Sequence, residues 1–183
     1  MALKRKRPFS KKSGYLKFIW MSFRKPFKYV EIISTQRDFK KALFFGLGNI
    51  CLGLLLEILL KVILTNYWVL FFPFVSEIFF PVFLLLFFLL LFGVFLYVLA
   101  KILKGKGNFK SSMSATFFST TPLLFGFLPI LQIIAILYWI FLLIISFLKI
   151  HQYSKTYAVL NIIIPVSVII LILFALGLIN LIS

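Results

Sequence analysis

The sequence predicts an all-α, polytopic membrane protein with five transmembrane helices, its N-terminus inside and its C-terminus outside. Three observations lead to this fold class. Hydrophobic residues make up 63% of the 183 residues, whereas soluble domains hold about 45–50%. They gather in five long runs, and the connections between the runs alternate between lysine-rich and free of Lys and Arg. Because basic residues are retained in cytoplasmic loops, this alternation predicts the orientation of every run.

The five runs are long enough to cross a bilayer as helices. A helix rises about 1.5 Å per residue, so roughly 20 residues cross the hydrocarbon core. In lipid, every backbone N–H and C=O needs an internal partner, which favours helices over open strands. The predicted spans are residues 42–64, 78–100, 111–128, 130–148 and 157–182.

The positive charge follows the predicted inner side of the membrane. Of the 20 Lys and Arg residues, 13 precede the first span. The later inner connections carry Lys101, Lys104, Lys106, Lys110, Lys149 and Lys155. A net charge of +16 would suggest nucleic acid in a soluble protein, but juxtamembrane cations are attracted to anionic lipid by about 1 kcal/mol each. We therefore predict that the anionic inner leaflet, and not nucleic acid, is their partner.

The segment before the first span divides into two parts. Residues 1–14 are basic and punctuated by Pro, Gly and Ser, and we expect a disordered tail there. In residues 15–41, apolar residues recur at spacings of three and four, interrupted at Pro26, which predicts one or two amphipathic helices on the cytoplasmic membrane surface. The alternative is a loop whose aromatic residues pack on the spans. The residues predicted to bind lipid headgroups are Lys17, Arg24, Lys25 and Lys28.

The first span, 42–64, carries small residues and two charges. Gly46 and Gly53 allow another backbone to approach closely, so we expect this helix to pack inside the bundle. Glu57 and Lys61 lie four residues apart and can neutralise each other on one face. A carboxylate at membrane depth is also a candidate for handling protons or cations. Glu57 is therefore predicted to be either half of a structural ion pair or part of an ion path.

The third predicted span, 111–128, is short and rich in Ser and Thr. Pro122 removes a backbone donor and kinks or ends a helix, so this segment is expected to pack against protein rather than to face lipid. Pro129 begins the next span after a tight turn, which predicts an antiparallel hairpin of the third and fourth spans. The fifth span contains Pro165, a second predicted kink.

The sequence offers little catalytic chemistry. It holds four acidic residues, one histidine and one cysteine, and it lacks the nucleophile elbow, the HExxH motif and the nucleotide fingerprints. His151 has no further ligand residues in its loop, so we expect it to fix the loop by hydrogen bonding and not to bind a metal. Ser154 is expected to cap the last span. An enzyme acting on lipid would have only His151, Ser154 and Tyr157 at the inner face, so we predict no enzyme, no cofactor and no metal.

An ordered series of features runs from Gly105 to Pro165. It comprises GKGNF in the inner loop, the small-residue run that ends in Pro122, the proline that opens LPILQII, the segment HQYSKTYAVL and then Pro165. In this order of features the chain resembles the Yip-domain family, the Ypt/Rab-interacting membrane proteins. Upstream, FRKPFKYVEI and DFKKALFFGL are similar to the entry segment of short prokaryotic-type members.

The resemblance implies five spans, a cytosolic N-terminus and a non-enzymatic integral membrane protein. Eukaryotic relatives bind prenylated Rab-type GTPases, but the chain has neither their long cytosolic N-terminal region nor a DLYGP-type motif, which argues against GTPase binding. We therefore expect a membrane-organising or protein-interaction module whose candidate partners are lipids, other membrane proteins and further copies of itself. The expected location is a prokaryotic plasma membrane, or the ER or Golgi membrane of a eukaryote. The alternative is a small transporter or channel subunit that uses Glu57 and the kinked third and fifth spans.

Overall fold

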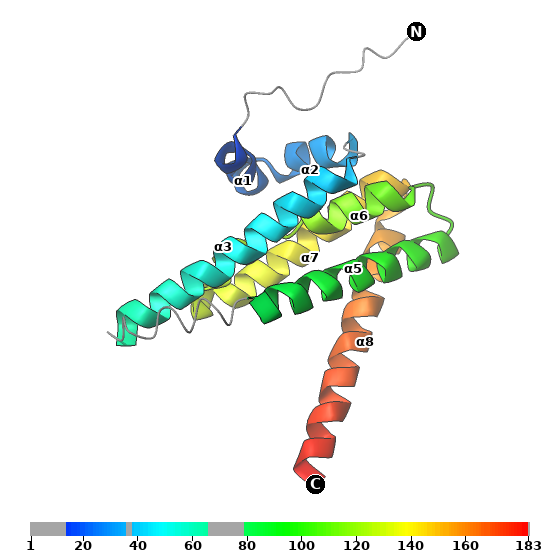
Figure 1. Cartoon of the computed structure of the whole chain (residues 1–183). Coiled ribbons are helices and arrows are strands. Elements are labelled where there is room, and N and C mark those ends of the chain that lie inside the picture. Colours follow the sequence, from blue (N-terminus) through cyan, green and yellow to red (C-terminus); the bar gives the residue numbers. More distant parts are fainter. Residues whose placement is uncertain (1–13, 36–37, 66–78, 183) are drawn as a thin grey trace.

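The computed structural model describes residues 14–35, 38–65 and 79–182, and all the secondary structure in these residues is helical (Figure 1). The predicted all-α class is confirmed. The elements are α1 (Tyr15–Arg24), α2 (Pro26–Thr35), α3 (Phe39–Thr65), α5 (Phe79–Ile102), α6 (Phe109–Phe118), the 3-10 helix η2 (Thr121–Phe125), α7 (Pro129–His151) and α8 (Lys155–Ile182). The predicted basic tail and the connection between the first two predicted spans, residues 65–77, lie outside the described residues, except for Gly14 and Thr65.

Among the described residues, three helices are long and apolar enough to cross a membrane. They cover Phe39–Leu64, Phe80–Ile102 and Leu131–His151, which correspond to the first, second and fourth predicted spans. α8 has 28 residues and is apolar over Lys155–Val168. Several helices of this length and composition are typical of a polytopic membrane protein.

The third predicted span is not one continuous helix. α6 ends at Phe118, four residues before Pro122, and Pro122 lies in the first turn of η2, where its missing N–H costs little. The hydroxyl of Thr121 donates to the carbonyl of Phe118 at 2.9 Å, which is the carbonyl that an N–H at position 122 would reach in an α-helix. Side-chain hydroxyls thus replace the backbone donor, and the helix breaks before the proline rather than at it.

α6 is the central helix of the bundle. It contacts α2, α3, α5 and α7, and every residue over 111–118 is buried, so the expectation that this polar segment packs against protein is confirmed. Phe117 of α6 fills the space that Gly46 of α3 leaves open, because a Cβ on Gly46 would lie 2.6 Å from the Cδ1 of Phe117. At Gly53 the nearest atom would be 3.5 Å away, which is ordinary contact. Close approach therefore requires glycine at position 46 and not at position 53.

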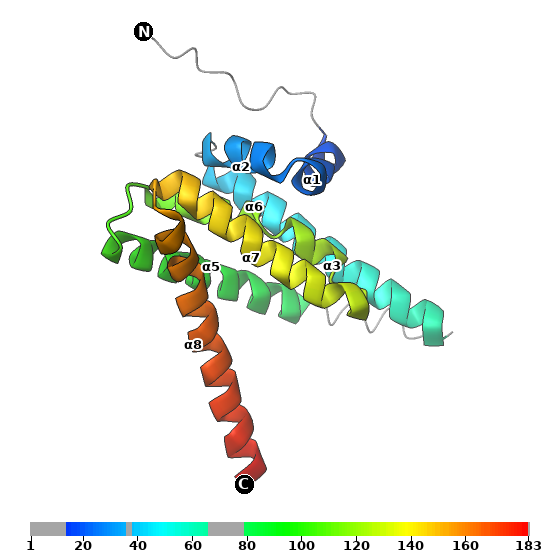
Figure 2. The ribbon, with the colours of Figure 1, turned by 180° about the vertical axis from the view of Figure 1, so that it is seen from behind.

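The segment before α3 forms two helices that lie across one side of the bundle (Figures 1 and 2). α1 ends at Arg24, and Pro26 begins α2. Their sides facing the bundle are buried, at Phe18, Ile19, Tyr29, Val30 and Ile33. The structure thus combines the two sequence-based alternatives, because helices form here and their aromatic residues also pack on the spans.

α8 leaves the bundle after its first turns. It begins next to the end of α7 and runs away from the other helices in both views (Figures 1 and 2). Its first part contacts α5 and α7, with Ala158, Asn161, Ile162 and Pro165 buried. The helix continues through Pro165, so the fifth predicted span is a single helix in the structure.

Candidate functional site

The hydroxyl of Tyr29 in α2 supplies a hydrogen-bond donor at the break between α6 and η2. Its side chain is fully buried, and its hydroxyl lies 2.7 Å from the carbonyl oxygen of Phe118 and 2.8 Å from Oγ1 of Thr121. Pro122 has no N–H to give to Phe118, so the hydroxyls of Tyr29 and Thr121 take its place. An unpartnered carbonyl in this apolar setting would be costly, and α2 is therefore a structural part of the bundle.

Two further hydrogen-bonded contacts fasten α1 to the bundle. The hydroxyl of Tyr15 donates to Asn49 of α3, and the Asn49 amide donates to Oγ1 of Thr120 at 3.1 Å. The hydroxyl of Tyr138 in α7 donates to the carbonyl of Ser22 at 2.6 Å. Asn49 lies ten residues after the first residue of α3, so α1 contacts the bundle about 15 Å along that helix.

The opposite sides of α1 and α2 carry the basic residues that the sequence predicts to bind headgroups. All four are exposed, and we call them the basic surface: Lys17, Arg24, Lys25 and Lys28. Between them, Leu16, Trp20 and Phe27 are 75%, 64% and 68% exposed. Aromatic rings at headgroup level beside lysines that extend toward water are typical of a membrane interface. The ion pairs within the described residues use Lys41 and Lys61 instead.

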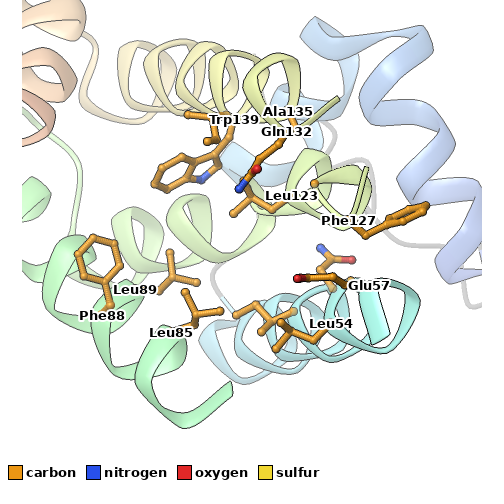
Figure 3. Close-up of a pocket in the computed structure, with 15 residues that line it drawn as sticks. Leu54, Glu57, Leu85, Phe88, Leu89, Leu123, Phe127, Gln132, Ala135 and Trp139 are labelled. Atoms are coloured by element: carbon orange, nitrogen blue, oxygen red, sulfur yellow. The ribbon is translucent and has the colours of Figure 1, made fainter. Parts of the chain in front are cut away.

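Glu57 takes part in an ion pair and also lines a groove. Its Oε1 lies 2.8 Å from Nζ of Lys61. A groove of about 300 Å³ opens between α3, α5, η2 and α7, and Glu57 lies on its wall together with Gln132 and Trp139 (Figure 3). Most of the lining is apolar, including Leu54, Leu85, Phe88, Leu89 and Leu123. Glu57 therefore belongs both to the ion pair with Lys61 and to the wall of the groove.

His151 joins the end of α7 to α6 and to the connection between α5 and α6. It is almost completely buried, and its Nε2 lies 2.9 Å from Oγ of Ser112. Its ring stacks with Phe147 and Tyr153 at centroid distances of 5.2 Å, and its carbonyl accepts the N–H of Lys106 at 3.1 Å. The hydrogen bonds of His151 thus reach α6 and the connection between α5 and α6, and the role in fixing its own loop, between the fourth and fifth predicted spans, stays a prediction.

Two glycines of the connection between α5 and α6 make room for His151. A Cβ on Gly105 would lie 2.6 Å from Nδ1 of His151 and 2.5 Å from the hydroxyl oxygen of Tyr153. A Cβ on Gly107 would lie 2.7 Å from Cε1 of His151. The Tyr153 hydroxyl donates to the carbonyl of Ala100 at 2.6 Å, and burial raises the pKa of Tyr153 to about 12, so it keeps its proton at neutral pH. The sequences GKGNF and HQYSKTY thus meet in one packed cluster.

The remaining predicted positions have local roles at helix starts. The N–H of Tyr157 donates to Oγ of Ser154 at 3.4 Å, a long capping bond in the first turn of α8. Pro129 is the first residue of α7, a position that needs no N–H donor. Ser154 and Pro129 therefore do not converge with Glu57 or His151 on one site.

Sequence reasoning missed the tyrosines that dock α1 and α2, above all Tyr29 and Tyr138. The sequence held a signal for Tyr15, because its partner Asn49 is a polar side chain inside an apolar run and needs a partner in lipid. No group of three His, Cys, Asp or Glu side chains that could bind a metal ion occurs in residues 14–35, 38–65 and 79–182.

The chain matches a known protein family. A family model described as the Yip1 domain matches residues 20–177. No curated protein and no solved structure matches the chain. The matched range begins in the middle of α1 and ends in α8, so it includes the second half of α1, all of α2, the His151 cluster and all three candidate spans.

Proposed function

The chain belongs to the Yip1 domain family, and from that premise we propose that it is a non-enzymatic membrane-organising or protein-interaction module. The proposed topology has five spans, formed by α3, α5, α6 with η2, α7 and α8, with the N-terminus inside and the C-terminus outside. The positions of the lysines support this orientation. The proposed location is a prokaryotic plasma membrane, or the ER or Golgi membrane in a eukaryote.

The observation that carries this proposal is how α1 and α2 are held. Tyr29 and Phe18 are buried against the bundle, while the basic surface points away from it. Cations on a docked helix pair keep fixed positions relative to the spans, so they can hold anionic lipid at one place beside the protein. We propose that the module organises the inner leaflet in this way.

A fluorescence measurement tests the lipid contact at the basic surface. The chain has three tryptophans, so Trp68→Phe and Trp139→Phe leave Trp20 as the reporter. In nanodiscs, a brominated anionic lipid should quench Trp20 more strongly than the same fraction of a brominated zwitterionic lipid, because the neighbouring cations attract it. Glutamine at all four positions of the basic surface should remove the difference. About 1 M salt should reduce it, since the Debye length is then about 3 Å.

The matched control removes the same charge elsewhere. Glutamine at Lys101, Lys104, Lys106 and Lys110 also deletes four cations on the inner side, but not from α1 or α2, and should leave the difference in quenching unchanged. Equal quenching by the two lipids in the unsubstituted reporter chain would contradict the proposed lipid contact.

A second candidate function is a small transporter or channel subunit, and the groove in Figure 3 favours it because Glu57 lies on its wall. Carboxylates at membrane depth commonly mark ion or proton paths. The break before Pro122 and the proline in α8 would supply the irregular helices. We rank this function second, because Lys61 neutralises Glu57 and the lining is mainly apolar.

Flux through proteoliposomes separates the two functions. Under the leading proposal, vesicles containing the chain should carry protons and potassium no faster than protein-free vesicles, and Glu57→Gln should change nothing. The double variant Glu57→Gln, Lys61→Gln keeps the net charge and controls for an unpaired lysine. A flux that is present in the unsubstituted chain and abolished by both variants would replace the leading proposal with the transporter.

A further inference from the structure

A second groove lies between α2, α7 and α8. Its volume is about 610 Å³, and its lining comes from α2, the last turns of α7 and the first turns of α8. Figure 2 shows the end of α7 and the start of α8 next to each other. α2 contributes Phe27 and Val30, α7 contributes Ile144 and Leu148, and α8 contributes Val159. The wall is therefore apolar on all three sides, and the groove occupies the angle at which α8 separates from the bundle.

Two lysines complete the lining of this groove. Lys149 is in the last turn of α7 and Lys155 is the first residue of α8, and both side chains are exposed. None of the described residues that line the groove is acidic, so the lining itself does not neutralise them. The connection between α7 and α8 is on the inner side in the proposed topology, which places both ammonium groups at headgroup level.

We propose that this groove binds one phospholipid with an anionic headgroup. An acyl chain lies against the apolar wall, and the phosphate lies near Lys149 and Lys155. The volume is in the range of ligand sites, about 300–1,000 Å³, and basic pockets between transmembrane helices on the cytoplasmic side suit anionic headgroups. The inference rests on the orientation in the proposed function, but it uses cations that are not part of the basic surface.

The bound lipid has a structural consequence for α8. Val159 of α8 and Phe27 of α2 line the same groove and are 41% and 68% exposed, so a lipid between them covers apolar surface that the protein leaves open. The lipid therefore supports the divergence of α8 from the bundle.

Native mass spectrometry of the full chain tests this site. The purified chain in neutral detergent is mixed with equal amounts of phosphatidylglycerol and phosphatidylcholine that carry the same acyl chains. We expect an excess of the phosphatidylglycerol adduct. Lys149→Gln and Lys155→Gln together should reduce this preference by roughly fivefold for each lysine. Val159→Trp fills the apolar wall and should lower the retention of both lipids.

Three controls make the outcome specific. Leu160→Trp places the same ring on the next residue of α8, which is similarly exposed and lies outside the groove, and it should retain both lipids. The glutamine variant of the basic surface should keep its phosphatidylglycerol adduct even though it loses the Trp20 quenching difference, so the two proposals can fail separately. Excess inorganic phosphate should not displace the lipid.

Three results would overturn the inference. The first is equal retention of the two lipids by the unsubstituted chain. The second is unchanged retention in both the double lysine variant and Val159→Trp. The third is displacement by inorganic phosphate, which would indicate a simple anion site instead of a lipid groove.

Discussion

Replacing Tyr29 with alanine should loosen α1 and α2 from the bundle and lower the thermal unfolding midpoint of the purified chain by roughly 10 °C. Removing a buried aromatic side chain costs about 3–5 kcal/mol, and each kcal/mol lowers the midpoint by about 2–4 °C in a protein of this length. Tyr29 is fully buried, and its ring lies 4.6 Å from that of Phe18. The truncation therefore removes both ring packing and one donor to the carbonyl of Phe118.

A second variant separates these two losses. Tyr29→Phe keeps the ring but removes the hydroxyl, so the Phe118 carbonyl retains only the side-chain donor of Thr121. The net loss of one hydrogen bond costs about 1 kcal/mol, which should lower the midpoint by about 2–4 °C. Circular dichroism in detergent measures the midpoints, and limited proteolysis should cut the Tyr29→Ala chain faster near α1 and α2.

The control for Tyr29 is an exposed residue of α1. Leu16 is 75% exposed, so Leu16→Ala should leave the midpoint and the cleavage pattern nearly unchanged. If Tyr29→Ala were no more harmful than Leu16→Ala, α2 would not be anchored at the break between α6 and η2.

The lengths of the main helices could be predicted because they depend on local composition. The predicted span 42–64 corresponds to the helix Phe39–Thr65, and the predicted span 130–148 corresponds to the helix Pro129–His151. The sequence predicted that the third span kinks or ends at Pro122, but α6 already ends at Phe118, and the position of this end depends on hydroxyl groups. An apolar pattern marks a length of chain, but it does not show that Thr121 will take the place of a backbone donor at Pro122.

The polar contacts also divide into those that the local sequence predicts and those that it does not. Glu57 and Lys61 are four residues apart, so helical geometry alone predicts that they can form an ion pair. Ser112 and His151 are 39 residues apart, and Tyr29 and Thr121 are 92 apart, so no local pattern connects them. An apolar helix face is also the same in sequence whether lipid or protein covers it, which is why the docking of α1 and α2 required the structure.

Truncating His151 to alanine should release the connection between α5 and α6 from the end of α7. The ring is almost completely buried between Phe147 and Tyr153 and lies 2.9 Å from Oγ of Ser112. A buried large-to-small change together with a lost hydrogen bond costs about 3 kcal/mol, so the midpoint should fall by roughly 6–12 °C. His151→Gln can keep a bond to Ser112 without the ring, and its effect should be intermediate.

Hydrogen exchange shows whether this loss is local. The N–H of Lys106 donates to the carbonyl of His151, so its exchange should accelerate in His151→Ala, because local opening becomes easier than global unfolding. The exposed neighbour Gln152 provides the control, since Gln152→Ala keeps the ring and should leave that exchange unchanged. If the Lys106 N–H stayed protected in His151→Ala, the glycines at 105 and 107 would hold the connection without the histidine. The meeting of GKGNF with HQYSKTY would then depend on close backbone packing alone.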